Sequence, residues 1–346
     1  LKLGSIPLCR AGPLLWQATC HARAREKMVT MKQKAAPAKR AKKVVGLYEK
    51  YKGRNIPEPR LKRPTVRAGL KAISWNVGGL RAFLAKRTKQ LRKLVQQEKP
   101  AILGILEHKL QEGEQVEEAT KSLRAALPQY TASLFSCSKQ KKGYSGVAVL
   151  LRDDLLKSAK VTPVKLEKGP DEGRTVCIEL PKLFVLICYV VNSGDGLKRL
   201  RERIGSWDPQ LRNYLKGLAR RKPVMLLGDL NVAHRDADIW NLEAPHIPKS
   251  SATTPEERAG FERLLEAGFV DGFAHMHPEA MGAFTYWSVR AQNRKPNRGL
   301  RLDYAIVTAD MAKGKGSKVS LADAFHLPAF APAGDHCPVG ATLTGV

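Results

Sequence analysis

The chain has 346 residues, of which 43% are hydrophobic, so it is long enough to bury a sizeable core. Its 60 lysines and arginines exceed its 32 aspartates and glutamates, and the formal charge of +28 indicates a polyanionic partner such as nucleic acid. The longest apolar run, residues 183–191, has about half the length that a membrane-spanning helix needs. The six cysteines lack the spacing of a zinc site. We therefore expect neither a membrane protein nor a structural zinc.

Residues 1–67 are basic and have little hydrophobic periodicity, which predicts a largely disordered N-terminal extension. If translation includes residues 1–27, this arginine-bearing leader resembles an organelle transit peptide, such as a mitochondrial one. If translation starts at Met28 or Met31, the basic cluster at residues 39–43 resembles a nuclear-localisation signal or a DNA-contacting arm. The third interpretation is a solvent-exposed basic tail that carries no targeting signal. The sequence leaves these alternatives open.

From Leu70 onward, strand and helix patterns alternate, which predicts one α/β catalytic domain over residues 68–346. One helix has a clear start, because Thr254 is a good N-cap, Pro255 follows it, and Glu257 stands at the third helical position. The predicted strands are residues 71–77, 101–106, 147–151, 175–180, 184–191, 224–227, 302–307 and 339–343. The predicted helices are residues 80–97, 114–127, 197–204, 208–220 and 255–267.

Two Gly-Asp turns adjoin apolar strands, one ending in Asp229 and the other in Asp335. Asn231 follows Asp229 by two residues, so an extended turn would place both side chains on one side. A carboxylate and an amide there suit a general base and a group that orients the attacking water. His336 follows Asp335, and Asp303 is a candidate partner for its imidazole. A carboxylate-supported imidazolium is a good donor to a phosphate oxygen in a transition state.

Glu107 ends an apolar strand, where an unpaired carboxylate is costly unless it is neutralised. A hard divalent ion, Mg²⁺ or alternatively Mn²⁺, is the natural neutraliser for oxygen ligands. Asn76, at the end of the first strand, is placed to orient Glu107 or a metal-bound water. These residues together predict a metal-assisted phosphodiester hydrolase.

From residue 71 to the C-terminus, the chain resembles the exonuclease III class of apurinic/apyrimidinic (AP) endonucleases, within the endonuclease/exonuclease/phosphatase superfamily. The segments that carry this resemblance occur in family order. They are residues 74–77, 79–82, Glu107 with Lys109, 143–147, 172–174, 189–190 with Asn192, 228–234, 285–287, 301–304 and 334–338.

The resemblance implies a four-layered α/β sandwich, in which two mixed β-sheets pack together and helices flank them. It also implies cleavage of the phosphodiester 5′ to an abasic site in double-stranded DNA, leaving a 3′-hydroxyl. The same class allows 3′-5′ exonuclease or 3′-phosphodiesterase activity. We expect a monomer with no membrane partner.

By this resemblance, Asp229 activates water, Asn231 orients it, and His336, held by Asp303, contacts the phosphate. Glu107 and Asp335 adjoin the metal, with Asn76 beside them. Tyr189 and Asn192 form a phosphate-side pair. The residues expected to contact substrate are Asn192, Arg81, Arg174, Tyr286, Trp287, Leu300 and Leu302.

The chain departs from the family pattern at five positions. Many relatives have an acidic or amide residue at Gly78, glutamine at Leu106 and tryptophan at Leu300. Asp195 and Arg290 lie close to where some animal enzymes have an intercalating arginine and methionine. We expect the chemistry to be retained and the preference for abasic over intact nucleotides to be weaker.

Two other classes of function remain open. One is a phosphodiesterase of the same superfamily that acts on an RNA 3′ end or a phosphoinositide. The other is a non-catalytic nucleic-acid-binding or ribosome-associated protein. The aromatic pair Tyr286 and Trp287 in a basic chain favours DNA, and the retention of Asp229, Asn231 and His336 favours an enzyme.

Overall fold

The computed structural model describes residues 55–166, 168–314 and 318–346. The predicted roles of residues 1–54 in targeting or DNA contact lie outside this range. The described residues belong to one compact unit. In the described ranges, no helix has the length and apolar character needed to cross a membrane.

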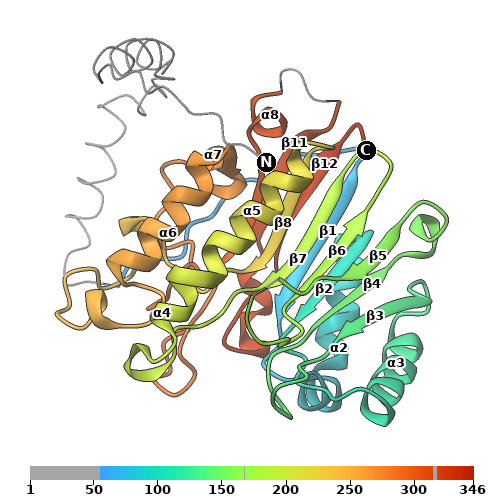
Figure 1. The fold of residues 1–346 in the computed structure, drawn as a ribbon, viewed down its shortest axis with the longest axis horizontal. Coiled ribbons are helices and arrows are strands. Elements are labelled where there is room, and N and C mark those ends of the chain that lie inside the picture. Colours follow the sequence, from blue (N-terminus) through green and yellow to red (C-terminus); the bar gives the residue numbers. More distant parts are fainter. Residues whose placement is uncertain (1–54, 167, 315–317) are drawn as a thin grey trace, which may run out of the picture. The chain divides into compact units, whose positions relative to one another are not determined.

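Two six-stranded mixed sheets lie face to face at the centre of this unit (Figure 1). The first has the order β11-β12-β1-β2-β4-β3 and the second β5-β6-β7-β8-β10-β9. The strands of the first sheet are β1 (Leu70–Asn76), β2 (Ile102–Leu106), β3 (Ala132–Ser136), β4 (Val147–Leu151), β11 (Ser320–His326) and β12 (Val339–Thr344). Those of the second are β5 (Lys160–Pro163), β6 (Thr175–Glu179), β7 (Phe184–Tyr189), β8 (Val224–Asp229), β9 (Phe269–Asp271) and β10 (Asp303–Thr308).

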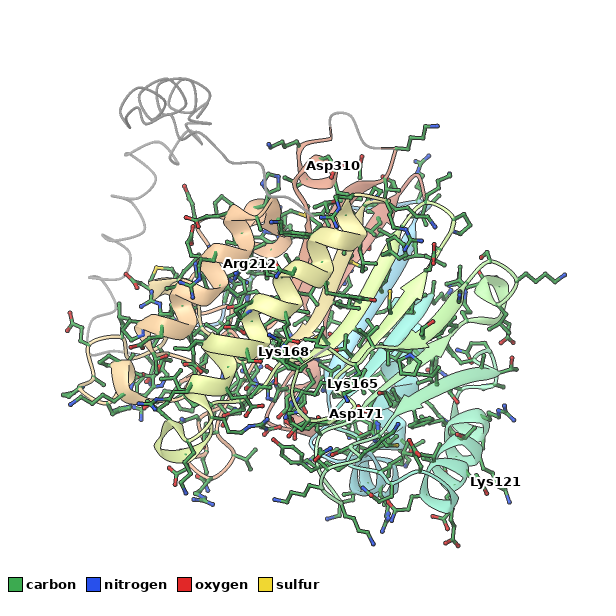
Figure 2. The ribbon with its side chains drawn as sticks, in the orientation of Figure 1. Lys121, Lys165, Lys168, Asp171, Arg212 and Asp310 are labelled. Atoms are coloured by element: carbon green, nitrogen blue, oxygen red, sulfur yellow. The ribbon has the colours of Figure 1, made fainter. Side chains whose placement is uncertain are left out.

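Helices cover the outer face of each sheet, which confirms the four-layered α/β sandwich (Figure 1). The first sheet carries α2 (Leu80–Glu98) and α3 (Glu114–Ala126), and the second carries α5 (Asp208–Ala219) and α6 (Pro255–Glu266). Shorter helices are α4 (Leu200–Glu202), α7 (Gly272–Met276) and α8 (Ala309–Lys313). Basic side chains such as Lys121 of α3 and Lys165 and Lys168 of the β5–β6 loop are exposed (Figure 2).

Three apolar layers hold the sandwich together. Alternate strand residues face opposite sides of a sheet, so Ile187 of β7 packs between the sheets while its neighbour Leu186 packs beneath α5 and α6. Trp75 belongs to the layer beneath α2 and α3. The two sheets approach closely at Gly104, where a Cβ atom would lie 2.6 Å from Cγ2 of Ile187. A larger residue at position 104 would therefore force the sheets apart.

Every predicted strand is present within one or two residues, and each lies inside a sheet. The strands that the sequence did not predict, β3, β5, β9 and β11, are the edge strands. Edge strands have less buried surface, and β3 and β5 accordingly lack the continuous apolar run that marks an inner strand. Hydrophobic patterning therefore identified only the strands with neighbours on both sides.

The predicted helices at residues 80–97, 114–127, 208–220 and 255–267 are confirmed, including the capping box between Thr254 and Glu257. The separate helix expected at residues 197–204 is wrong. Instead, α4 continues through a π-helical turn, Arg203–Trp207, directly into α5. Short 3₁₀ turns cover Asp153–Leu155, Asp195–Leu197, Asp236–Asp238, Ile247–Lys249 and Pro328–Ala333.

Residues 55–67, which the sequence assigned to a disordered extension, pack against the domain. Ile56 is 2% exposed and lies in one apolar cluster with Trp287. Arg63 forms ion pairs of 2.9 Å with both Glu98 and Asp323. Residues near the end of the predicted extension therefore make specific contacts with the domain.

Candidate active site

The strand ends bring the predicted polar residues together. Asn76 ends β1, Glu107 follows β2, Tyr189 ends β7, and Asp229 ends β8. The neighbouring strands β1 and β2 are parallel, as are β7 and β8, so these ends share an edge of each sheet. Asp303 begins the antiparallel strand β10 directly opposite Asp229.

Gly228 explains why a Gly-Asp turn stands at the end of β8. Its φ is +152°, and a Cβ atom here would overlap the carbonyl oxygen of Cys188 on β7. Glycine thus lets the end of β8 approach β7 and places the next residue, Asp229, at the edge of the sheet.

His336 lies between two carboxylates. Its Nδ1 is 2.8 Å from Oδ2 of Asp303, and its Nε2 is 3.8 Å from Oδ2 of Asp229. All three residues are buried, at 5%, 1% and 1% exposure for His336, Asp303 and Asp229. Solvent therefore stabilises these charges only weakly, and the electrostatic interactions among the three groups are strong.

The two carboxylates favour a charged imidazole. Burial opposes the charged ring, but Asp303 and then Asp229 raise the pKa of His336 to about 10. Burial and the Asp303 carboxylate raise the pKa of Asp229 to about 7, although His336, Asn231 and Asn76 act in the opposite direction. Near pH 8, the cluster holds an ionised Asp229 beside an imidazolium.

One ligand atom from each of Asp229, Asp303 and His336 lies within 4.8 Å of the others, a spacing that suits a metal ion. A protonated imidazole has no lone pair for a metal, however. The hydrogen bond to Asp303 and the raised pKa of His336 therefore favour an imidazolium between carboxylates over a metal at this position.

Asn231 adopts a left-handed backbone conformation, with φ of +48°, so the turn is not extended as the sequence analysis assumed. Its backbone N–H donates to Oδ1 of Asp229 at 2.8 Å, which brings the two residues together in another way. The Asn231 amide donates to the Val190 carbonyl at 2.9 Å and accepts from Nδ2 of Asn192 at 2.8 Å. These bonds fix the orientation of both amides.

Asn76 bridges the candidate metal ligand Glu107 and the candidate general base Asp229. Its Nδ2 lies 3.1 Å from Oε1 of Glu107 and 3.0 Å from Oδ2 of Asp229. Burial would raise the pKa of Glu107, but Lys109, Tyr189 and Asn76 together hold it below its ordinary value. Burial, with Glu107 and Asp229, raises the pKa of Tyr189 well above its usual range, so this hydroxyl remains a donor.

Glu107 and Asp335 are the candidate metal ligands, and both lie beside Gly78. A Cβ atom at position 78 would lie 3.9 Å from Oδ1 of Asp335, while the Gly78 carbonyl and Glu107 contact the same lysine, Lys109. Carboxylate and carbonyl oxygens are the donors that Mg²⁺ prefers, so this position fits such an ion. The absence of a side chain at Gly78 therefore affects the candidate metal position directly, whereas Leu106 points into the apolar layer between the sheets.

A pocket of about 420 Å³ adjoins the catalytic cluster, and Tyr286 and Leu300 form part of its wall. The Tyr286 ring lies 4.9 Å from the His336 ring, measured between centroids. The pocket is also lined by Asn241, Ser251 and Arg298, and most of its exposed surface is apolar. Arg81, Asp195 and Arg290 are exposed, as substrate-contacting residues would be.

Three predicted substrate contacts are buried instead. Arg174 is 2% exposed; it pairs with Glu172 at 2.6 Å and lies 4.7 Å from the Tyr189 ring. Trp287 is 2% exposed and donates to Asn297, and Leu302 is 4% exposed in an apolar cluster. Arg174 thus lies against Tyr189, and Leu302 belongs to the apolar cluster against which Tyr286 and Leu300 pack.

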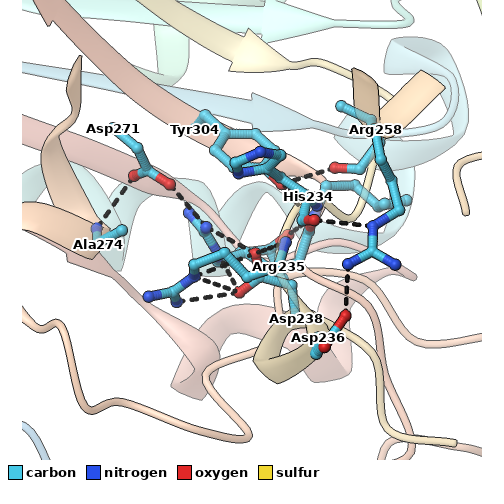
Figure 3. Close-up of polar contacts among 12 residues, drawn as sticks. His234, Arg235, Asp236, Asp238, Arg258, Asp271, Ala274 and Tyr304 are labelled. Atoms are coloured by element: carbon cyan, nitrogen blue, oxygen red, sulfur yellow. Dashed lines mark hydrogen bonds and ion pairs between the residues drawn. The ribbon is translucent and has the colours of Figure 1, made fainter. Parts of the chain in front are cut away.

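Two buried arginines, Arg203 and Arg301, support the site, although no role was predicted for them from the sequence. Arg203 donates to the carbonyls of Val191, Leu230 and Asn231, and so stabilises the left-handed turn. Arg301 makes paired 2.8 Å hydrogen bonds with Asp238 and a 2.6 Å bond with Asp271. Figure 3 shows the ion pairs around these two aspartates. In the sequence, Arg301 stands between two apolar residues, Leu300 and Leu302, and this pattern could have indicated that its side chain is buried.

Comparison with known proteins places this geometry in a family. Residues 73–336 match the model of the endonuclease/exonuclease/phosphatase family. The DNA repair nuclease APEX1 of Danio rerio is 38% identical over 273 residues, which cover 79% of this chain and 81% of that protein. The AP endonuclease of Leishmania major superimposes with a TM-score of 0.71 at 28% identity, covering 89% of this chain and 99% of that one. A 3′ phosphatase from Neisseria, bound to a product DNA hairpin, superimposes with a TM-score of 0.62 at 25% identity, covering 79% of this chain and 98% of that one.

The fold and site define a metal-dependent phosphodiester hydrolase. The chain belongs to the endonuclease/exonuclease/phosphatase family. Within it, the chain is a nuclease of the DNA-repair class, the class of the relatives that it matches over most of its length.

Proposed function

We propose that the protein hydrolyses the phosphodiester 5′ to an abasic site in double-stranded DNA and leaves a 3′-hydroxyl. The observation that carries this proposal is the position of the Asp229–His336–Asp303 cluster beside the Tyr286 pocket. A flipped-out sugar without its base fits against an aromatic wall. Relatives named as DNA repair nuclease and AP endonuclease support the same substrate.

In this proposal, ionised Asp229 removes the proton from the attacking water, and Asn231 orients that water. The His336 imidazolium donates to a non-bridging phosphate oxygen, where negative charge grows in the transition state, and Asp303 keeps the ring charged. Tyr189 and Asn192 donate to the other side of the phosphate. Glu107 and Asp335 would hold a divalent ion, Mg²⁺ or Mn²⁺, which supplies electrophilic stabilisation of the phosphate when bound.

A gel assay of a duplex that carries one tetrahydrofuran abasic analogue tests this function. We expect one incision 5′ to the analogue in Mg²⁺, none in EDTA, and a single-protomer mass in solution. Cleavage of a phosphoinositide or a single-stranded RNA 3′ end in preference to this duplex would contradict the proposal. A cut that persists unchanged in EDTA would contradict the metal-dependent part.

The pocket favours 3′-5′ exonuclease activity as a second function at the same site. Its volume of about 420 Å³ leaves room for a nucleotide that keeps its base. Leu300 contributes a smaller side chain here than the tryptophan of many relatives. A recessed matched 3′ end is the substrate that measures this activity, and a complete lack of 3′ nucleotide release would exclude it.

A further inference from the structure

The ammonium group of Lys109 lies beside the candidate metal ligand. Its Nζ is 3.0 Å from Oε2 of Glu107 and 3.1 Å from the carbonyl oxygen of Gly78. These are a carboxylate and a carbonyl oxygen, the same donor types that a hard divalent cation takes. The lysine side chain is 37% exposed, so it has a free path to solvent.

The backbone holds Lys109 in this position. Glu107 and Lys109 both have left-handed φ values, +50° and +59°, and the Lys109 N–H donates to the Ser145 carbonyl at 2.9 Å. The aliphatic part of the side chain passes over the Gly78-Gly79 turn, where a Cβ atom at Gly79 would lie 3.8 Å from Cδ of Lys109. The lysine side chain thus runs along this turn before it reaches Glu107.

We propose that the Lys109 ammonium competes with the divalent ion for Glu107, so that Lys109 lowers the affinity of the enzyme for that ion. This inference rests on the proposed function, because it takes Glu107 as a metal ligand. Two cations within about 4 Å of each other repel strongly in a partly buried site, even where both contact the same carboxylate. Binding of the ion therefore favours displacement of the lysine side chain.

Bound DNA would offer the displaced lysine another anion, since the phosphates of the substrate lie at this face in the proposed complex. A phosphate contact that draws Lys109 away from Glu107 favours the ion. By linkage, the ion then strengthens DNA binding by the same factor. The lysine thus couples the binding of the ion to the binding of DNA, so that the affinity for the ion is higher when substrate is present.

Mn²⁺ binding, followed by the electron paramagnetic resonance signal of the free ion, tests the inference without any measurement of catalysis. We expect Lys109→Met to bind Mn²⁺ about tenfold more tightly than the wild type in the absence of DNA. An uncleavable abasic duplex should tighten Mn²⁺ binding to the wild type, and this gain should be much smaller in Lys109→Met. Lys121→Met, on the exposed face of α3, is the matched control and should behave as the wild type.

Unchanged or weaker Mn²⁺ binding by Lys109→Met, with native circular dichroism, would overturn the inference. Glu107→Gln separates this result from a failure of the wider proposal. If that variant keeps wild-type Mn²⁺ binding, Glu107 is not a ligand, and the inference is wrong on that ground. If wild-type protein binds Mn²⁺ through Glu107 but does not incise abasic DNA, the proposed function alone is wrong.

Discussion

Asp303 lies directly opposite Asp229 in the antiparallel pairing of β10 with β8. Like charges at opposed positions destabilise a sheet unless a cation lies between them. His336 supplies that cation, with 2.8 Å to Asp303 and 3.8 Å to Asp229. The fold therefore makes the charge states of Asp229 and His336 depend on each other and on the Asp303 carboxylate beside them.

This coupling predicts the pH dependence of incision. Asp229 must be ionised, so kcat/KM should rise with pH through about 7; His336 must be protonated, so kcat/KM should fall as pH passes about 10. In Asp303→Asn, the loss of a carboxylate lowers the pKa of both groups, so both limbs should move to lower pH. A pH profile of kcat/KM measures this, and an alkaline limb that stays in place would show that Asp303 does not hold the imidazolium.

Arg301 should contribute strongly to stability. Arg301→Met leaves the carboxylates of Asp238 and Asp271 buried with fewer partners, and removal of one member of a buried ion pair costs about 3–5 kcal/mol of unfolding free energy. Urea denaturation measures the difference. Arg152→Met is the control, because its pair with Asp154 is on the surface and should contribute less than about 1 kcal/mol. Equal losses in the two variants would contradict the structural role of Arg301.

Arg203 should affect turnover through the position of Asn231. Arg203→Lys keeps a positive charge but loses the planar guanidinium that holds the three carbonyls, so the left-handed turn should shift and kcat should fall about ten- to a hundredfold. KM should change less than kcat, because the pocket formed by Tyr286 and Leu300 lies elsewhere. Steady-state incision kinetics measure both values, with Arg212→Lys of α5 as the control. A rise in KM alone would show that Arg203 does not position the reacting groups.

Leu300 should set the selectivity of the pocket. In Leu300→Trp, an indole fills part of the 420 Å³ space and excludes a nucleotide that still has its base. Pocket differences of this size discriminate by about 1–3 kcal/mol, so the ratio of abasic incision to 3′ nucleotide removal should rise about 10- to 100-fold. Comparison of kcat/KM for the two substrates gives this ratio. A level or falling ratio would mean that position 300 does not control access.

The sequence predicted the inner strands and the main helices because continuous apolar runs and helix caps carry local signals. It also placed Asn76, Glu107, Asp229, Asp303 and His336 at strand ends, which the fold then brings together. The edge strands, the π-helical turn and the backbone of Asn231 were missed, because long-range contacts such as those of Arg203 determine them. The sequence did not show how deeply each side chain is buried: Arg174 and Trp287, which it predicts to contact substrate, are both buried.

The assignment of Asp229 as general base is tested most directly by single-turnover incision of an abasic-analogue duplex with saturating enzyme. Asp229→Asn preserves size and hydrogen bonding but cannot accept the proton, so the rate should fall at least about a hundredfold while duplex affinity changes only a few-fold. Asp154→Asn, on the surface, should keep the wild-type rate. A near-wild-type rate for Asp229→Asn would contradict the account.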